Sequence, residues 1–571
     1  MNNNIRIVRD YLESLKEDRE LDAIFPILLM AMDFRIVSTP RNSKGQSQYG
    51  KDVVAIGKGE NGVIYRWYFE LKGNAAQDIN DTTFMAPDGV RESIMAAKDV
   101  PFVDSGIPYF NQLPVKIVFV HNGILQENTR PQFEGFIVRE FPNGGFERWD
   151  IEKLTNLFSI YLFNESLLVD ERSSKLLKKI LILLDTPGWR TTDVTALVEV
   201  LLTHCVADKP KRERKMGFCS IHLLLAMILQ ECEENENLLP AKKASDVIVL
   251  KVWEWMLRQG VENNTLYLQW YSRIVRLHIH IYTLYFDKLL PLARTYKGLY
   301  MPNGGESERI LYGVRCFDFL GDMLYYYEVL QTIDIPITDI RAMVREQRDC
   351  VIDVIKHNSG FDLPLLDTQT IPILMTLRFM LLKYEHEEKD EELIVKWVQR
   401  IVLNLKIYYR QHKMLPEVNG DRRDLAKSMY DKADFYRDQS SLLLTQLAEI
   451  VAWIGDKNLY KLLYDLIKES GVNLQVAYPI PYDDLEFSLF NHRLYKEMAV
   501  EIDVKIPENV AKFDENFEKR YNHIPLRTEK TAFRFLETLA HVYYKTDWFP
   551  DYVSFGHIKP EENEINQKTE K

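Results

Sequence analysis

The chain has 571 residues, of which 46% are hydrophobic and 12% aromatic, and its formal net charge at pH 7 is -12. This length and composition predict an ordinary globular protein of two or more domains and exclude a largely disordered chain. The negative charge argues against a protein that coats nucleic acid through bulk electrostatics, although it allows a local basic groove.

The cysteines and the N-terminus favour an intracellular protein. The five cysteines lie in one central span without a C-x-x-C pair, which predicts neither a disulfide framework nor a zinc site. Residues 1–18 are charged and lack an apolar core, so they do not read as a secretory signal. The longest apolar runs are shorter than the roughly 20 residues that a membrane span needs. We therefore expect a cytoplasmic protein with no transmembrane helix and no membrane partner.

The start of the chain predicts a helix, a strand and a loop. Apolar residues recur at helical spacing over 5–32, and Pro26 predicts a kink or break within that stretch. Residues 34–38 predict a short strand. The polar stretch 39–49 predicts a mobile loop.

A β-hairpin is predicted next. Two apolar runs, 53–56 and 63–71, flank the sequence GKGENG, whose glycines and Asn-Gly pair favour a tight turn. After the hairpin, 88–99 predicts a helix with Asp88 as its N-cap, and the apolar run 115–121 predicts a strand buried on both faces.

The end of this first module is predicted near residue 160. Residues 135–140 predict a short strand, and Asp150 is expected to cap the helix that follows it. Helices and strands in this order are typical of an α/β domain, which we assign to residues 1–160.

The rest of the chain predicts a large all-α region, residues 161–560. Long amphipathic segments with helical spacing follow one another with few strand signals, for example 191–204, 220–234, 244–259, 266–290, 390–411 and 440–455. Joints between sub-domains are predicted near 209–215, 303–305 and 419–420, and residues 561–571 are expected to be a disordered tail.

Three polar side chains are predicted to meet at one edge of the hairpin. Asp52 stands where the first strand begins, and Glu70 and Lys72 lie two residues apart on the second strand. Because side chains alternate along a strand, Glu70 and Lys72 share one face while their apolar neighbours point to the other. A buried Glu and Lys without a function cost free energy unless they pair, and a solvent-facing Glu70–Lys72 pair is the structural alternative.

Asp52 followed by Glu70-Leu71-Lys72 resembles the D…(D/E)-x-K core of the PD-(D/E)xK, or restriction-endonuclease-like, nuclease superfamily. The resemblance covers roughly residues 5–160, and its closing half is similar to that of Mrr-type defence nucleases. Lys51 stands where the superfamily motif has proline.

The resemblance implies a Mg²⁺ (or Mn²⁺) site. Asp52 and Glu70 would be metal ligands, with the backbone carbonyl of Leu71 and a carboxylate from the first helix as further ligands. For that last carboxylate we select Glu20, with Asp22 or Glu17 as substitutes. Lys72 would orient or help to deprotonate the attacking water, or offset developing charge.

Nucleic-acid contacts are predicted outside this core. Gln77 follows the motif and is a candidate for contact with a phosphate or base. The basic run 209–215, with Lys211, Arg212 and Arg214, is a candidate for the nucleic-acid backbone, and a solvated interhelical loop is its alternative interpretation.

Together these expectations predict a Mg²⁺-dependent endonuclease that acts on DNA and is controlled by its helical region. The resemblance implies a role in defence against phage or foreign DNA, and a homo-oligomer or a partner defence protein is expected because cutting two strands needs two sites. Two alternatives stay open: an RNA-directed nuclease, and a catalytically inactive scaffold or sensor.

Overall fold

The computed structural model of the protein describes residues 2–39, 49–59, 61–73, 78–104, 107–161, 171–186, 189–332, 337–382, 385–417, 425, 440–479, 485–491, 498–502, 504–512 and 524–546. The chain divides into two compact units, Met1–Ile281 and Tyr282–Lys571. Most of the predicted loop 39–49, the predicted joint at 419–420 and the predicted tail 561–571 lie outside the described residues.

The first unit begins with a five-stranded mixed sheet whose strands lie side by side in chain order. The first three strands pair antiparallel, and the last three pair parallel. The strands are β1 (Arg35–Ser38), β2 (Val53–Lys58), β3 (Ile64–Lys72), β4 (Val115–His121) and β5 (Phe146–Trp149). The strands predicted at 34–38, 53–56, 63–71 and 115–121 are therefore present.

The hairpin between β2 and β3 closes through the predicted glycine-rich turn. The amide of Gly59 donates to the carbonyl of Val63 at 2.8 Å, and Gly62 adopts a φ of +77°, a left-handed conformation that glycine reaches without a steric cost. A turn of fixed length sets the register of the two strands, and Val53 lies opposite Phe69.

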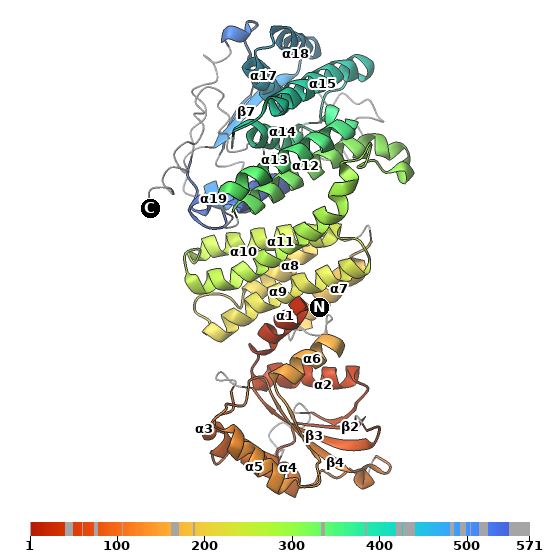
Figure 1. The fold of residues 1–571 in the computed structure, drawn as a ribbon, viewed down its shortest axis with the longest axis vertical. Helices are drawn as coiled ribbons and strands as arrows, with labels where there is room; N and C mark the ends of the chain where they lie inside the picture. Colours follow the sequence, from red (N-terminus) through yellow and green to blue (C-terminus); the bar gives the residue numbers. More distant parts are fainter. Residues whose placement is uncertain are drawn as a thin grey trace. The chain divides into compact units, whose positions relative to one another are not determined.

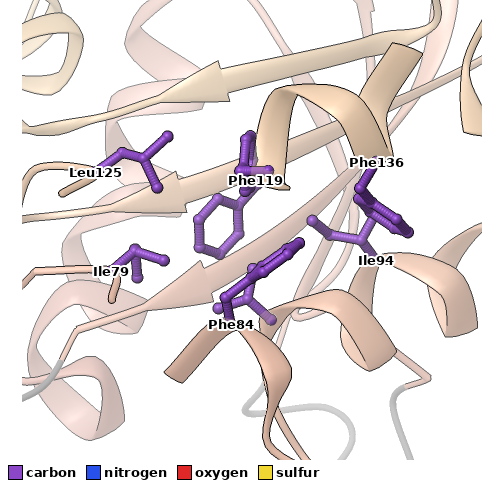
Figure 2. Packing of buried hydrophobic residues seen from close by; sticks show 8 residues of the cluster. Ile79, Phe84, Ile94, Phe119, Leu125 and Phe136 are labelled. Atoms are coloured by element: carbon purple, nitrogen blue, oxygen red, sulfur yellow. The ribbon is translucent and has the colours of Figure 1, made fainter. Parts of the chain in front are cut away.

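Helices pack on both faces of this sheet (Figure 1). The elements that precede or cover the sheet are α1 (Asn2–Leu12), η1 (Glu17–Leu21), α2 (Asp22–Ala31), α3 (Asp81–Met85), α4 (Val90–Asp99), η2 (Phe110–Gln112), α5 (Arg130–Glu140) and α6 (Ile151–Tyr161). Figure 2 shows the core on one face, where Phe84 of α3, Ile94 of α4 and Phe136 of α5 surround Phe119 of β4. On the other face the ring of Phe69 lies 5.2 Å from that of Phe25 in α2.

One predicted strand is wrong. Residues 135–140 form the second half of α5, and the edge strand β5 comes later in the chain. Phe133 and Phe136, nearly one helical turn apart, are both buried against the sheet, and Pro131 stands in the first turn, where a helix tolerates it. The spacing of these aromatic residues outweighs the strand preference of Phe136, Ile137 and Val138.

The break in the N-terminal helix also differs from the prediction. The chain leaves the helical path after Leu12, and Pro26 lies buried inside α2. In a regular helix a proline ring clashes with the carbonyl four residues earlier, which here belongs to Asp22. At Asp22 the wider π-helical turn η1 passes into α2.

The remainder of the first unit is helical, as predicted. Its helices are α7 (Glu171–Leu183), α8 (Thr191–Leu202), α9 (Lys211–Glu234), α10 (Leu239–Gln259) and α11 (Thr265–Ala293), the last of which continues into the second unit. Among the described residues α9 is long and apolar enough to cross a membrane, and 72% of its apolar window is buried inside the chain. Such burial is typical of a core helix in a soluble protein.

The second unit is mainly helical but contains a second sheet. Its helices are α12 (Glu308–Thr332), α13 (Ile337–His357), α14 (Thr370–Leu377), α15 (Glu388–His412), α17 (Leu442–Ile454), α18 (Lys457–Ser470), α19 (Leu485–Asn491) and α21 (Phe535–Tyr544), with short helical turns η4 (Pro302–Ser307), η5 (Ser359–Asp362), η6 (Asp367–Gln369), η7 (Arg378–Leu382), η9 (Val510–Lys512) and η10 (Thr528–Lys530). The predicted joint at 303–305 falls in η4, between α11 and α12.

The prediction of an all-α region after residue 161 is therefore wrong in part. The second sheet has three strands, β6 (Ser440–Ser441), β7 (Asn473–Pro479) and β8 (Met498–Ile502). In β7 the side chains of Leu474 and Val476 are buried while Gln475 between them is only half-buried. This alternation is that of a strand, but it is too short to stand out among long helical patterns.

Candidate functional site

The β2–β3 register brings Asp52 and Glu70 together. Asp52 stands one residue before β2, whose first residue, Val53, pairs with Phe69, so Asp52 lies at the same end of the hairpin as Glu70. The Asp52 carboxylate also accepts a hydrogen bond of 2.7 Å from the backbone amide of Leu71, which fixes its position on β3.

Lys72 completes this group of side chains. Its Nζ lies 3.0 Å from Oε1 of Glu70, whose side chain is buried. A third carboxylate approaches from η1, because Oε1 of Glu17 lies 3.4 Å from the same Nζ. The backbone amide of Gly73 donates to Oε2 of Glu17 at 3.3 Å, and the Glu17 amide donates to the Gly73 carbonyl at 2.8 Å.

The surroundings of the cluster raise the pKa of two of its carboxyl groups, Asp52 and Glu17, and of Lys72. Burial, followed by the charge of Glu70, raises the pKa of Asp52 to about 8. Burial by itself would lower the pKa of Lys72, but the carboxylates of Glu70 and Glu17 outweigh it and raise that pKa. Burial also raises the pKa of Glu17. Lys72 is therefore a permanent cation at neutral pH, whereas Asp52 titrates near it.

Glu17, and not Glu20, is the first-helix carboxylate that reaches the cluster. Glu20, selected from the sequence, instead accepts hydrogen bonds from Arg212 Nη1 at 2.8 Å and Nη2 at 3.2 Å, and from the amide of Lys16 at 2.7 Å. Asp22, the other substitute, is the first residue of α2. A π-helical turn has no signature in the hydrophobic pattern, so the side on which each of these carboxylates lies was not readable from spacing.

Two further residues of the site were not predicted. Lys51 is only 7% exposed, its Nζ donates to the carbonyl of Tyr49 at 2.7 Å, and burial lowers its pKa to about 8. His121 lies beside Lys72 across the parallel β3–β4 pair and is fully buried. Burial lowers its pKa to about 4, and a contact with the backbone of Gly123 opposes this shift only in part. The sequence feature that could have identified His121 is its position as the last residue of the apolar run 115–121, which predicts a buried strand.

Two of the predicted nucleic-acid residues, Arg212 and Arg214, are bonded to other side chains of the first unit. Residues from Lys211 onward form the first turns of α9, so the predicted joint at 209–215 is mostly helical. Arg214 donates to the hydroxyl of Tyr267 at 3.0 Å, Arg212 is bonded to Glu20, and Lys211 is exposed. The two arginines thus have partners within the chain. Gln77 lies outside the described residues.

Two carboxyl groups of the cluster have the chemistry of divalent-cation ligands. Mg²⁺ and Mn²⁺ prefer carboxylate oxygens, and a bound cation would favour the ionised form of Asp52, whose pKa burial raises to about 8. Among the described residues no group of three or more His, Cys, Asp or Glu side chains is arranged to hold a metal ion. Of the predicted ligands, Asp52 and Glu70 lie at this end of the sheet, whereas Glu20 is bonded to Arg212.

Comparison with known proteins assigns no family to the chain: no protein-family model, no curated protein and no solved structure matches it.

Proposed function

We propose that the N-terminal module is a restriction-endonuclease-like domain and that the protein is a divalent-cation-dependent endonuclease acting on DNA. The observation that carries this proposal is the cluster at the end of β3, where Asp52 accepts from the Leu71 amide and Lys72 is bonded to Glu70. An antiparallel hairpin that continues into parallel strands, with α4 between β3 and β4, supports the fold assignment. Defence against phage or foreign DNA is the proposed role and rests on the resemblance alone.

Asp52 and Glu70 would hold the Mg²⁺ ion, with the backbone carbonyl of Leu71 as a further ligand. When bound, such a cation supplies positive charge to the phosphate and lowers the pKa of the attacking water. The amide of Leu71 keeps the Asp52 carboxylate on β3, and this fixed geometry spares the site a rearrangement during the reaction.

Lys72 acts in this proposal as a fixed positive charge. Its raised pKa keeps it protonated, so it stabilises negative charge on the phosphate and orients the attacking water instead of removing a proton. Glu70 and Glu17 hold the ammonium group from two sides. A bound cation would favour the ionised form of Asp52, whose pKa is about 8 without one.

A cleavage assay tests the proposal. The full-length protein is incubated with supercoiled plasmid or with structured RNA in Mg²⁺ or Mn²⁺, alongside Glu70→Gln and Lys72→Met. We expect nicking and linearisation of the plasmid, and a loss of about 100- to 1000-fold in each variant, as for removal of one charge-stabilising group. Glu127→Gln is the matched control, because the Glu127 side chain is 84% exposed and its one ion pair with a described residue is with Arg130.

The alternatives predict other results. Cleavage of RNA alone that depends on Glu70 and Lys72 would replace DNA by RNA as the substrate. Absence of any cleavage that Glu70→Gln abolishes, with both metals and both substrates, would contradict the nuclease proposal and favour the scaffold or sensor.

A further inference from the structure

The short segment η1 carries two glutamates that face different parts of the first unit. Glu17 lies against Lys72 and the backbone of Gly73, at the end of β3. Glu20, three residues later, lies against Arg212 at the start of α9. One π-helical turn therefore joins the candidate site to the helical layer that follows the α/β module.

The contact between Glu20 and Arg212 is well formed for an ion pair. Both N–H groups of the guanidinium fork reach the carboxylate, at 2.8 Å and 3.2 Å, and the two side chains are only 14% and 15% exposed. A partly buried, bidentate pair is stronger and more specific in direction than an exposed lysine pair. We call this bidentate contact between Arg212 and Glu20 the Arg212 clamp.

Arg212 also holds the chain that leads into η1. Its Nη1 donates to the carbonyl of Ser14 at 2.7 Å, so a single guanidinium bonds the chain on both sides of Lys16. From the sheet, Asn122 donates to the carbonyls of Leu12 and Leu15 at 2.9 Å and 2.8 Å. The connection between α1 and η1 is thus fixed by one residue from the sheet and one from α9.

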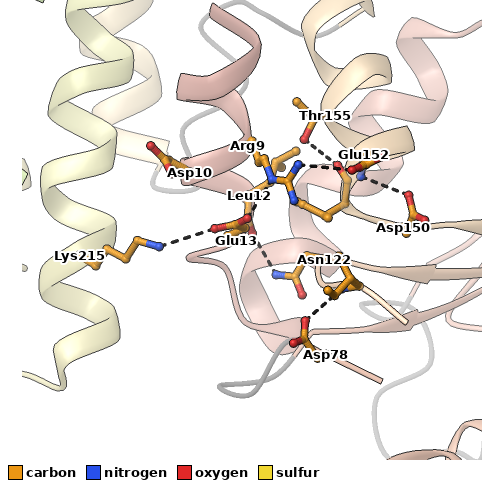
Figure 3. A network of polar contacts seen from close by, with 12 residues as sticks. Arg9, Asp10, Leu12, Glu13, Asp78, Asn122, Asp150, Glu152, Thr155 and Lys215 are labelled. Atoms are coloured by element: carbon orange, nitrogen blue, oxygen red, sulfur yellow. Dashed lines mark hydrogen bonds and ion pairs between the residues drawn. The ribbon is translucent and has the colours of Figure 1, made fainter. Parts of the chain in front are cut away.

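Further ion pairs follow the same junction. Lys215 of α9 forms an ion pair with Glu13 (Figure 3), with 3.8 Å between the charged atoms. Nζ of Lys16 lies 3.6 Å from Oε1 of Glu213. Arg273 of α11 pairs with Asp10 of α1. These ion pairs are longer or more exposed than the Arg212 clamp. Of the four, the Arg212 clamp is the one that binds a residue of η1, Glu20.

We propose that Arg212 is a positioning residue for the candidate site: by holding Ser14 and Glu20 it fixes η1 and thereby keeps Glu17 against Lys72 and Gly73. The inference rests on the proposed function, because Glu17 matters there as the second carboxylate that contacts Nζ of Lys72. It replaces the role in nucleic-acid binding predicted for Arg212. Displacement of the start of α9 would change the position of Glu17, which makes this junction a route by which the helical layer controls the site.

The first part of the test measures position without activity. Hydrogen exchange is followed in the metal-free, full-length protein for peptides covering 13–21 and 64–73, in Arg212→Lys and Glu20→Gln. Lysine keeps the charge but cannot form the bidentate contact. We expect exchange about tenfold faster in both peptides, because the Glu17–Gly73 backbone bonds open more often, and unchanged exchange in a reference peptide covering 81–99. Lys211→Ala, which removes an exposed charge one residue away, is the control and should exchange like wild type.

The second part measures turnover and DNA binding separately. Arg212→Lys and Glu20→Gln should lower kcat about 10- to 100-fold with the Kd for DNA unchanged, as expected when a catalytic group is displaced. A weaker Kd in Arg212→Lys with unchanged kcat and unchanged exchange would overturn the proposal and return Arg212 to phosphate contact. Unchanged exchange in 13–21 and 64–73 would overturn it whatever the kinetics. If wild type cuts no nucleic acid, the proposed function fails, while the exchange result still decides whether Arg212 positions Glu17.

Discussion

The buried Asp52 carboxyl lowers the stability of the folded protein at neutral pH. Its pKa of about 8 in the folded chain, set by burial and by Glu70, stands well above the value of about 3.9 for an exposed aspartate. Between these two values the unfolded chain loses the proton and the folded chain keeps it. The contribution of Asp52 to the free energy of unfolding is therefore largest below about pH 4, and it decreases as the pH rises toward 8.

Asp52→Asn should remove this pH dependence. Asparagine keeps an oxygen that can accept from the Leu71 amide but cannot ionise, so the variant should be more stable than wild type near pH 8 and similar near pH 4. Urea unfolding in the presence of a chelator, at several pH values between about 4 and 8, measures the difference. Parallel stability curves for the two proteins would show that the Asp52 carboxyl is not buried beside a charge.

At the scale of elements, the start of β2 is positioned by Gly50. Its φ is +67°, and a Cβ atom at this position would lie 1.9 Å from the carbonyl oxygen of Ser93 in α4. The chain can approach α4 this closely only without a side chain. This contact places the two residues that follow, Lys51 and Asp52, at the end of the sheet.

Gly50→Ala should therefore destabilise the protein and impair the site. Left-handed backbone strain alone costs about 1–2 kcal/mol, and the overlap with Ser93 adds to it, so we expect a loss of more than about 2 kcal/mol in unfolding free energy. Gly62→Ala is a matched control, since Gly62 also has a positive φ but meets nothing within 4 Å. Thermal and urea unfolding compare the two variants. Equal losses in both would mean that the packing of Gly50 on α4 contributes nothing.

Elements with strong periodicity were predictable from the sequence, and those with competing signals were not. The β2–β3 hairpin follows from two apolar runs and an Asn-Gly turn, and β4 follows from a continuous apolar run. Asp150 caps α6 as expected and accepts from the amides of Glu152 and Lys153. The sequence predicts a strand in place of α5 because Phe136, Ile137 and Val138 favour strands, whereas the spacing of the buried Phe133 and Phe136 suits a helix. β7 was missed because seven residues carry too little periodic signal.

The same limit applies to the candidate site. Asp52, Glu70 and Lys72 meet because strand alternation and hairpin register are local rules that a sequence displays. Glu17 and Glu20 differ in environment because a π-helical turn places them, and Arg212 reaches Glu20 across 192 positions of sequence. Contacts between segments so far apart depend on packing, which spacing alone does not specify.

At the scale of the whole molecule, the first compact unit holds the sheet together with a layer of helices. The first compact unit extends to Ile281 and contains the sheet together with α7 to α10 and most of α11, whereas the predicted boundary was residue 160. α1 packs on both α6 and α9, which ties the start of the chain to both parts. The junction at Arg212 therefore lies inside one unit, where a change in the helices can reach the site through direct contacts.

Anomalous diffraction from crystals grown with Mn²⁺ would test most directly whether Asp52 and Glu70 form a cation site. The proposed function predicts one strong peak with carboxylate oxygens of both residues about 2.1 Å from it, and no such peak in Glu70→Gln. A density map without a peak at saturating Mn²⁺, with Asp52, Glu70 and Lys72 arranged as described, would contradict the proposed metal-dependent site.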